Sequence, residues 1–327
     1  MSGVDTKHDV VAVGNALVDI LAHVPDAFLA EYGMEKGSMS LIDTDRALEL
    51  QEALSGTVQT SGGSAANTMS GLASLGGSAL FIGKVSDDAL GDEFAREIES
   101  VGVQFVRGAS VHGVPTGRCV IAVTPDAQRT LNTFLGVSSM LTPEDIDRAA
   151  VESGKVVYLE GYLFDQPAAK AAFREAANIA HGAHRRVSLT LSDAFCVQRH
   201  REDFHALIDD EVDILFGNES ELESLYETAD FNEAVAQLRN HCEFAVITRS
   251  EKGSVVVTGG EVIEVPAMKV SRVVDTTGAG DLFAAGFLYG FTREMDLARC
   301  AEIGAIAAAE VISHMGPRPL VPLRDLI

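Results

Sequence analysis

Residues 275–281, Asp-Thr-Thr-Gly-Ala-Gly-Asp, combine the parts needed to bind an oxyanion and to remove a proton. They precede an apolar run with helical spacing at 282–287. Gly278 and Gly280 allow a sharp turn and leave backbone N–H groups uncovered by side chains. A helix start adds unpaired N–H groups and the positive end of its dipole. Asp281 places a carboxylate beside this anion site, where it can take the proton from an attacking hydroxyl. The pattern favours a phosphoryl transferase over a glycine-rich loop in which Asp281 is only a helix cap.

A second group of polar residues, Gly14-Asn-Ala-Leu-Val-Asp19, follows the apolar run at 9–14. This run reads as a buried strand, and ligands in open α/β sheets bind beyond the carboxyl ends of such strands. Asp19 could accept two hydrogen bonds from a vicinal diol, such as that of a ribose. From these residues alone, the pattern is explained equally well if Asn15 only forms a turn and Asp19 is solvated, with no ligand bound by either.

Strand-like and helix-like segments alternate along most of the chain. This rhythm predicts a mostly parallel sheet with helices on both faces. Residues 15–42 and 104–136 break it with alternating patterns and turn residues, which favours a small β-rich lid. We expect strands at 79–83, 156–159, 187–191, 212–216 and 245–248, and helices at 89–101, 166–182, 199–209 and 297–312. Residues 62–77 are expected to form a loop that enters a helix of small residues.

The composition restricts the class of protein and its partners. The 327 residues carry a formal net charge of −23, which argues against nucleic acid and anionic membranes as partners. No apolar run reaches the length of a membrane span, and the N-terminus lacks a signal-peptide core. The four cysteines lack metal-binding spacing and read as reduced thiols. We therefore expect a soluble cytoplasmic protein, monomeric or homodimeric, acting on small molecules.

The 275–281 segment resembles the second signature of the ribokinase-like (PfkB) family of carbohydrate and nucleoside kinases. The resemblance covers nearly the whole chain and implies one ribokinase-like kinase domain at 1–327. Its core would be 1–14, 43–103 and 137–327, with 15–42 and 104–136 as the lid. It implies ATP and Mg²⁺ as cofactors. The catalytic roles it implies are a base, Asp281; phosphate-binding amides, Gly278, Ala279 and Gly280; and a monovalent-cation (K⁺) site, Asp275 and Thr277.

The same resemblance assigns residues to the acceptor site. Asn15 and Asp19 match the Asn and the Asp of the family's Gly-Asn-x-x-x-Asp element, which holds sugar hydroxyls in its nucleoside kinases. Gly62, Gly63 and Asn67 match the first family signature, in which the glycines allow close approach to the sugar and the Asn binds a hydroxyl. A tight contact between helix and sheet would also explain these glycines.

Two further elements are implied to bind the nucleotide. Asn218 and Glu221 match the family's Asn-x-x-Glu element, which organises Mg²⁺ through water near the phosphates. The alternative is an Asn helix cap with acidic residues in the first turn. Thr248 and Gly253 match a Thr-x-Gly-x-x-Gly phosphate loop, but Ser250 replaces its first glycine.

Arg129 lies in the second lid segment, where an isolated arginine is usually solvated. In so acidic a chain, a lid arginine aimed at the γ-phosphate would offset charge that develops during transfer. Family members that phosphorylate adenosine carry an arginine at the matching place.

Within the family the chain is most similar to the members that phosphorylate adenosine. The implied reaction is ATP-dependent phosphorylation of a nucleoside 5′-hydroxyl, with adenosine as first choice and another purine nucleoside, ribose or fructose as alternatives. Met39 stands where those members tend to carry a Gln, so Tyr162, Phe164 or Phe134 would pack against the base. A dinucleotide-dependent oxidoreductase is disfavoured because the first strand does not lead into G-x-G-x-x-G. A catalytically silent relative is disfavoured because Asp281 is present.

Overall fold

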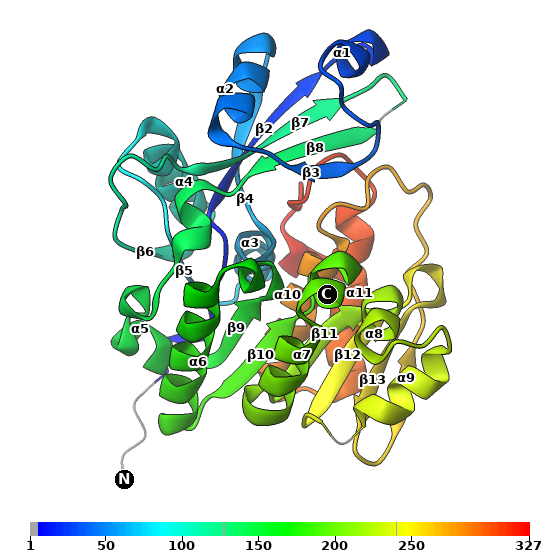
Figure 1. Cartoon of the computed structure of the whole chain (residues 1–327). Coiled ribbons are helices and arrows are strands. Elements are labelled where there is room, and N and C mark those ends of the chain that lie inside the picture. Colours follow the sequence, from blue (N-terminus) through cyan, green and yellow to red (C-terminus); the bar gives the residue numbers. More distant parts are fainter. Residues whose placement is uncertain (1–5, 127, 240) are drawn as a thin grey trace.

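A nine-stranded sheet forms the larger part of the molecule (Figure 1), in a computed structural model that describes residues 6–126, 128–239 and 241–327. The strand order is β14-β13-β12-β11-β10-β9-β1-β5-β6. The strands from β12 to β6 are parallel, and β13 and β14 continue the sheet in antiparallel pairing. Their bounds are β1 His8–Val13, β5 Ala79–Gly83, β6 Val103–Arg107, β9 Gly154–Glu160, β10 Arg186–Thr190, β11 Ile214–Asn218, β12 Phe244–Thr248, β13 Ser254–Thr258 and β14 Val262–Val265.

Helices cover both faces of this sheet, and each face has its own apolar core (Figure 1). One face packs against α5 Arg148–Glu152, α6 Pro167–Gly182, α7 Ala194–Glu211, α8 Glu219–Tyr226 and α9 Phe231–Leu238. The other packs against α3 Ser64–Ser74, α4 Ala89–Ser100, α10 Ala279–Phe291 and α11 Leu297–Val311. The predicted α/β class is confirmed. Helix α7 begins earlier than expected because the Asp193 side chain caps it by accepting from the Cys196 amide.

A separate five-stranded sheet, ordered β3-β8-β7-β2-β4, lies above one end of the large sheet (Figure 1). Its strands are β2 Leu17–His23, β3 Met39–Leu41, β4 Val58–Gly62, β7 Gly117–Val123 and β8 Arg129–Phe134, accompanied by α1 Asp26–Glu31 and α2 Thr44–Ala53. The strands of this small sheet are not the ones expected from the predicted lid boundaries. Strand β4 pairs with β2, although 43–103 was expected in the core, and β6 pairs with β5 of the large sheet, although 104–136 was expected in the lid.

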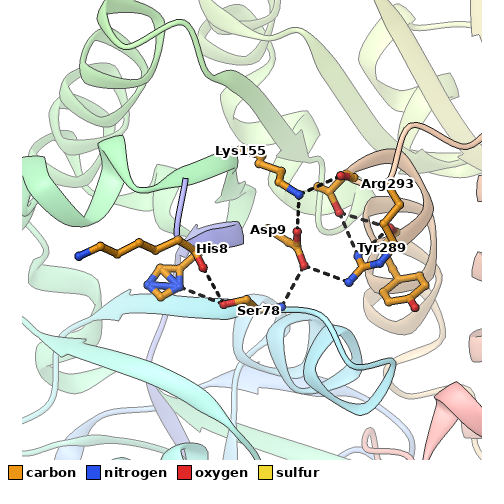
Figure 2. Close-up of polar contacts among 8 residues, drawn as sticks. His8, Asp9, Ser78, Lys155, Tyr289 and Arg293 are labelled. Atoms are coloured by element: carbon orange, nitrogen blue, oxygen red, sulfur yellow. Dashed lines mark hydrogen bonds and ion pairs between the residues drawn. The ribbon is translucent and has the colours of Figure 1, made fainter. Parts of the chain in front are cut away.

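The end of the large sheet away from the small sheet is held by ion pairs around Asp9 (Figure 2). Asp9, in β1, accepts hydrogen bonds from Lys155 of β9 and from the Ser78 amide, and pairs with Arg293 just past α10. Lys155 also donates to the carbonyl of Thr292. These contacts fasten the C-terminal end of α10 to the sheet, and so fix the helix whose other end carries Asp281.

None of the helices among the described residues is both long enough and apolar enough to cross a membrane.

Candidate active site

The N-terminus of α10 forms the expected glycine turn. Gly278 has a φ of 79°, in the left-handed region that favours glycine, and a Cβ there would lie 2.7 Å from the carbonyl oxygen of Pro317. A Cβ on Gly280 would meet nothing within 4 Å, and no side chain caps this helix end. The amide of Ala279 donates to the carbonyl of Thr276, so it is not open to a ligand in this conformation. The turn can still present helix-start N–H groups to an anion.

Asp281 lies in the first turn of α10, facing the start of α3. Its carboxylate accepts hydrogen bonds from Ser64 Oγ at 2.6 Å and from Asn67 Nδ2 at 3.2 Å. Burial raises the pKa of Asp281 to about 6, against the opposing effect of these hydrogen bonds and of the Arg318 charge. A carboxylate with this pKa is ionised at neutral pH and can accept a proton.

Asp19 lies on β2 of the small sheet, against the end of β4. A Cβ on Gly62 would lie 2.5 Å from the Asp19 Cγ, so the glycine makes room for this carboxyl group. Gly63 has a φ of 97°, and a Cβ there would lie 2.2 Å from the carbonyl oxygen of Asn15. None of the described residues donates a hydrogen bond to the Asp19 carboxylate, whose pKa burial raises to about 6. The carboxylate therefore keeps its acceptor capacity for a ligand.

Asn15 is buried and its amide is used within the protein. Its Nδ2 donates to Glu160 Oε1 at 2.8 Å, and its Oδ1 accepts from Ser138 Oγ at 3.1 Å. Glu160, at the end of β9, also accepts from the Ala65 amide at 2.9 Å, and burial raises its pKa to about 7. In this conformation Asn15 fixes the neighbouring backbone, and its direct contact with a substrate stays a prediction.

Asn67 is joined on its other side to Arg318, in the segment that follows α11. Arg318 Nε donates to Asn67 Oδ1 at 3.2 Å, and Arg318 Nη2 donates to the carbonyl of Ser61 at 2.6 Å. The predicted acceptor residues Asp19, Gly62, Gly63 and Asn67 thus come together beside Asp281, together with an arginine that was not predicted.

Arg129 reaches from β8 of the small sheet to the loop before α10. Its Nη1 lies 2.8 Å from Asp275 Oδ2, and both side chains are buried. Asp275 also accepts from Thr277 Oγ1 at 2.7 Å and from the Gly316 amide at 2.9 Å. Burial alone would raise the pKa of Asp275, but these hydrogen bonds and the Arg129 charge hold it below its usual value. The γ-phosphate role of Arg129 and the monovalent-cation site at Asp275 and Thr277 stay predictions.

A cleft of about 1460 Å³ opens beside the N-terminus of α10. A smaller cavity of about 70 Å³ lies against Asp281, and Asn218, Thr248 and Gly280 line both. Ala279 and Gly253 line the larger cleft as well. Four of the residues predicted to contact ATP, Asn218, Thr248, Gly253 and Gly280, therefore line one cleft, whereas Gly278 does not line it.

Asn218 and Glu221 form a reciprocal cap at the start of α8. The Asn218 Oδ1 accepts from the Glu221 amide at 2.9 Å, and its Nδ2 donates to Glu221 Oε1 at 2.6 Å. The alternative of a helix cap is therefore realised. Glu221 is nevertheless buried against the smaller cavity, and burial raises its pKa to about 7. The described residues hold no group of three acidic, His or Cys ligands, and the Mg²⁺ role of Glu221 stays a prediction.

Ser250 occupies a backbone conformation that favours glycine, with a φ of 51°. The loop thus has, at position 250, a backbone conformation that suits a glycine but carries a serine side chain. Gly253 has a φ of 91°, and a Cβ there would lie 2.1 Å from the carbonyl oxygen of Val265. The close approach at Gly253 is therefore structural, and Thr248, whose hydroxyl lies 3.4 Å from the Gly217 carbonyl, borders the cleft.

The residues expected near a nucleobase are not gathered in one place. Phe164 is 2% exposed and stacks on Phe204, so its predicted contact with the base is wrong because it belongs to the core. Tyr162 donates to the carbonyl of Ser192 at 3.3 Å. Met39, on β3, is 50% exposed, and Phe134 lines a separate cavity of about 380 Å³. Base contacts of Met39 and Tyr162 stay predictions.

Sequence reasoning missed Ser64, Glu160 and Arg318 as members of this cluster. Ser64 directly follows the predicted Gly62–Gly63 pair, and Glu160 directly follows the strand predicted at 156–159, at the ligand-binding edge, so position could have indicated both. Arg318 lies in an irregular Gly-Pro-Arg-Pro segment, where no spacing indicated a site.

Sequence and fold both match known kinases. The family described as pfkB family carbohydrate kinase matches residues 37–324. The solved adenosine kinase from Sinorhizobium meliloti is 49% identical, with a TM-score of 0.90 and 98% of each chain covered. A probable sugar kinase from Rhizobium etli is 45% identical, with a TM-score of 0.91 and the same coverage. Adenosine kinase from Saccharomyces cerevisiae is 29% identical over 333 residues, which cover 94% of this chain and 95% of that protein.

Proposed function

The chain belongs to the pfkB family of carbohydrate kinases, and we propose that it transfers the γ-phosphoryl group of ATP to the 5′-hydroxyl of adenosine. Membership makes it a phosphotransferase with an alcohol group as acceptor. Similarity to two adenosine kinases, one of them 49% identical, supports a nucleoside as acceptor. We further propose cytoplasmic purine salvage as its setting, which fits the absence of a disulfide among the described cysteines.

The surroundings of Asp281 carry the proposal. Its carboxylate accepts hydrogen bonds from Ser64 and Asn67, and it lines the cavity of about 70 Å³ together with Ser64 and Gly280. Gly280 also lines the cleft of about 1460 Å³. A hydroxyl held beside Ser64 and Asn67 would meet a phosphate held at the helix start, with Asp281 placed to remove its proton.

Asp19 is the group that favours a ribose as the reacting sugar. Its carboxylate lies against Gly62 and has no hydrogen-bond donor among the described residues. A 2′,3′-diol supplies two donors at the spacing of one carboxylate. Asn67, together with the backbone at Gly62 and Gly63, would close around the same sugar edge.

ATP would lie in the larger cleft, with its γ-phosphate toward Gly278 and Gly280. When bound, Mg²⁺ would neutralise phosphate charge during transfer. Glu221 and Asn218 would hold its water ligands, because the Glu221 carboxylate is buried beside the small cavity. The contact would run through water because both carboxylate oxygens already accept a hydrogen bond from Asn218. Arg129 would add positive charge from the small sheet.

A sugar kinase is the second candidate, favoured by the 45% identity to a probable sugar kinase and by the lack of a base-reading amide at Met39. The test is ADP release with adenosine, inosine, guanosine, ribose and fructose as acceptors, and identification of each product. We expect the highest kcat/KM for adenosine and a 5′-monophosphate product. Phosphorylation of ribose or fructose with no activity on any nucleoside would replace the proposal with the sugar-kinase assignment.

A further inference from the structure

Arg318 makes contacts to the predicted acceptor site for which the proposed reaction provides no role so far. Its side chain is 14% exposed. Nε donates to Asn67 Oδ1 at 3.2 Å, while Nη2 donates to the carbonyl of Ser61 at 2.6 Å and to its hydroxyl at 2.8 Å. Nη1 lies 3.6 Å from Glu97 Oε2. A single guanidinium therefore joins α3, β4 of the small sheet and α4.

The contact with Asn67 determines which end of that amide faces Asp281. A guanidinium can only donate hydrogen bonds, so it requires the carbonyl oxygen of the amide. The NH₂ group must then point the other way, where it donates to Asp281 Oδ2 at 3.2 Å. A flipped amide would place its NH₂ group against the guanidinium and its oxygen against the carboxylate, and both contacts would be repulsive.

We propose that Arg318 is a positioning residue for phosphoryl transfer, which orients the Asn67 amide toward Asp281 and links that orientation to Ser61 on β4. This inference rests on the proposed function, since it assumes that Asp281 is the base. Arg318 itself need not touch the substrate. It acts by holding the donor that positions the base, and by making that position depend on the small sheet.

The charges around the base agree with this arrangement. Burial is the main cause that raises the pKa of Asp281, and the positive charge of Arg318 opposes it. The carboxyl groups of Asp19 on β2, Glu160 on β9 and Glu221 on α8 also face this region, and the negative charge of Asp281 adds to the rise of their pKa values. Loss of the Arg318 charge would leave Asp281 and Asp19 with less compensation.

The simpler alternative is that Arg318 only fastens the C-terminal segment to β4. Ser61 alone would suffice for that purpose, because it supplies two of the acceptors. The two explanations differ in whether the effect of Arg318 on turnover depends on Asn67. A double-mutant cycle measures this dependence directly.

The experiment compares Arg318→Gln, Asn67→Ala and the double variant, with the acceptor that the substrate panel identifies. We expect Arg318→Gln to lower kcat by about tenfold or more, because small misplacements of reacting groups are costly. The acid limb of the pH profile should move to higher pH. In the Asn67→Ala background, the same change should lower kcat by less than about twofold.

Arg324→Gln is the matched control, since it removes the same charge from an exposed side chain six positions further along the chain. It should leave both kcat and the acid limb unchanged. Arg318→Lys keeps the charge but lacks the planar fork. It should keep the wild-type acid limb while kcat still falls, and it serves as the test if Arg318→Gln does not fold.

Equal losses of kcat from Arg318→Gln in both backgrounds would overturn the proposal. The proposal would also be overturned if Arg318→Gln kept the wild-type kcat and pH profile and only melted at a lower temperature. That result would indicate that Arg318 merely fastens the C-terminal segment to β4. The experiment stays separate from the nucleoside assignment. If the wild-type enzyme phosphorylates only a sugar, that assignment fails, and the cycle is run with the sugar and still tests Arg318.

Discussion

The guanidinium of Arg129, on β8 of the small sheet, lies 2.8 Å from the carboxylate of Asp275, in the loop that leads into α10. The two residues are 146 positions apart, and their side chains are 7% and 6% exposed. This ion pair fixes the small sheet against the turn that would hold the transferring phosphate. In the proposed mechanism, the Arg129 guanidinium would leave Asp275 and pair with a phosphate once ATP is bound.

Arg129→Ala should therefore have effects on both catalysis and stability. We expect kcat to fall more than the KM for the nucleoside rises, because charge that develops during transfer loses its compensation. The variant should also unfold more easily, by about 3–5 kcal/mol, because the buried Asp275 carboxylate loses its ion-pair partner. Steady-state kinetics and denaturant unfolding measure the two effects, with Arg129→Lys as the charge-conserving control. A change confined to the nucleoside KM would place Arg129 in substrate binding instead.

Asp281→Asn tests the proposed base. The substitution keeps size and polarity but removes proton acceptance, so kcat should fall by roughly 10²–10⁴-fold. Nucleotide affinity should change much less, because the backbone amides of the turn remain. Asp92→Asn, which changes an exposed carboxylate on α4, is the matched control. Wild-type turnover in Asp281→Asn would remove the residue from the mechanism.

The pH dependence should follow the ionisation of Asp281. Its pKa is about 6, and only the deprotonated form can accept a proton, so kcat/KM should fall as the pH falls through about 6. Ser64→Ala removes a hydrogen bond that favours the ionised form, and should move this acid limb to higher pH. Ser70→Ala is the control on the same helix, because its buried hydroxyl has no hydrogen-bond partner among the described residues. An acid limb that is identical in Ser64→Ala and wild type would contradict the assignment.

The diol hypothesis predicts discrimination against 2′-deoxyadenosine. Loss of the 2′-hydroxyl leaves one hydrogen bond to Asp19 unmade in a desolvated site, at a cost of about 1–3 kcal/mol. The kcat/KM should therefore lie roughly 10–100-fold below that for adenosine. Asp19→Asn should reduce this ratio, since it replaces one of the two acceptor oxygens with an NH₂ group that can only donate. Equal kcat/KM values for the two nucleosides would rule out recognition of the diol by Asp19.

Ser250→Gly tests the departure from the glycine pattern in the nucleotide loop. Ser250 has a φ of 51°, a conformation that costs about 1 kcal/mol for a residue other than glycine. We expect the substitution to relieve this cost without raising the KM for ATP. Glu294→Gly, at another left-handed position with a φ of 59°, is the control for stability. A rise in the KM for ATP in Ser250→Gly alone would indicate that the hydroxyl contacts the nucleotide.

Much of the fold was predictable because its signals are local. Apolar runs at the spacing of strands and helices indicated the parallel sheet and its covering helices, and the 275–281 pattern indicated the turn before α10. It was less predictable which strands belong to the small sheet. Strand β4 is short and has no distinctive pattern of its own, and only its pairing with β2 shows that it belongs there.

The amino-acid sequence by itself indicated the glycine turn, the helix start and the acid at Asp281, because all three lie within seven consecutive residues. Only the tertiary structure decided which side chains surround that acid. Arg318 meets Asn67 from 251 positions away, and Asn67 meets Asp281 from 214. Contacts of this kind arise from the packing of whole elements and leave no periodicity in the chain. The physical reason is that local spacing encodes backbone conformation, whereas the partners of a buried charge depend on which segments the fold brings together.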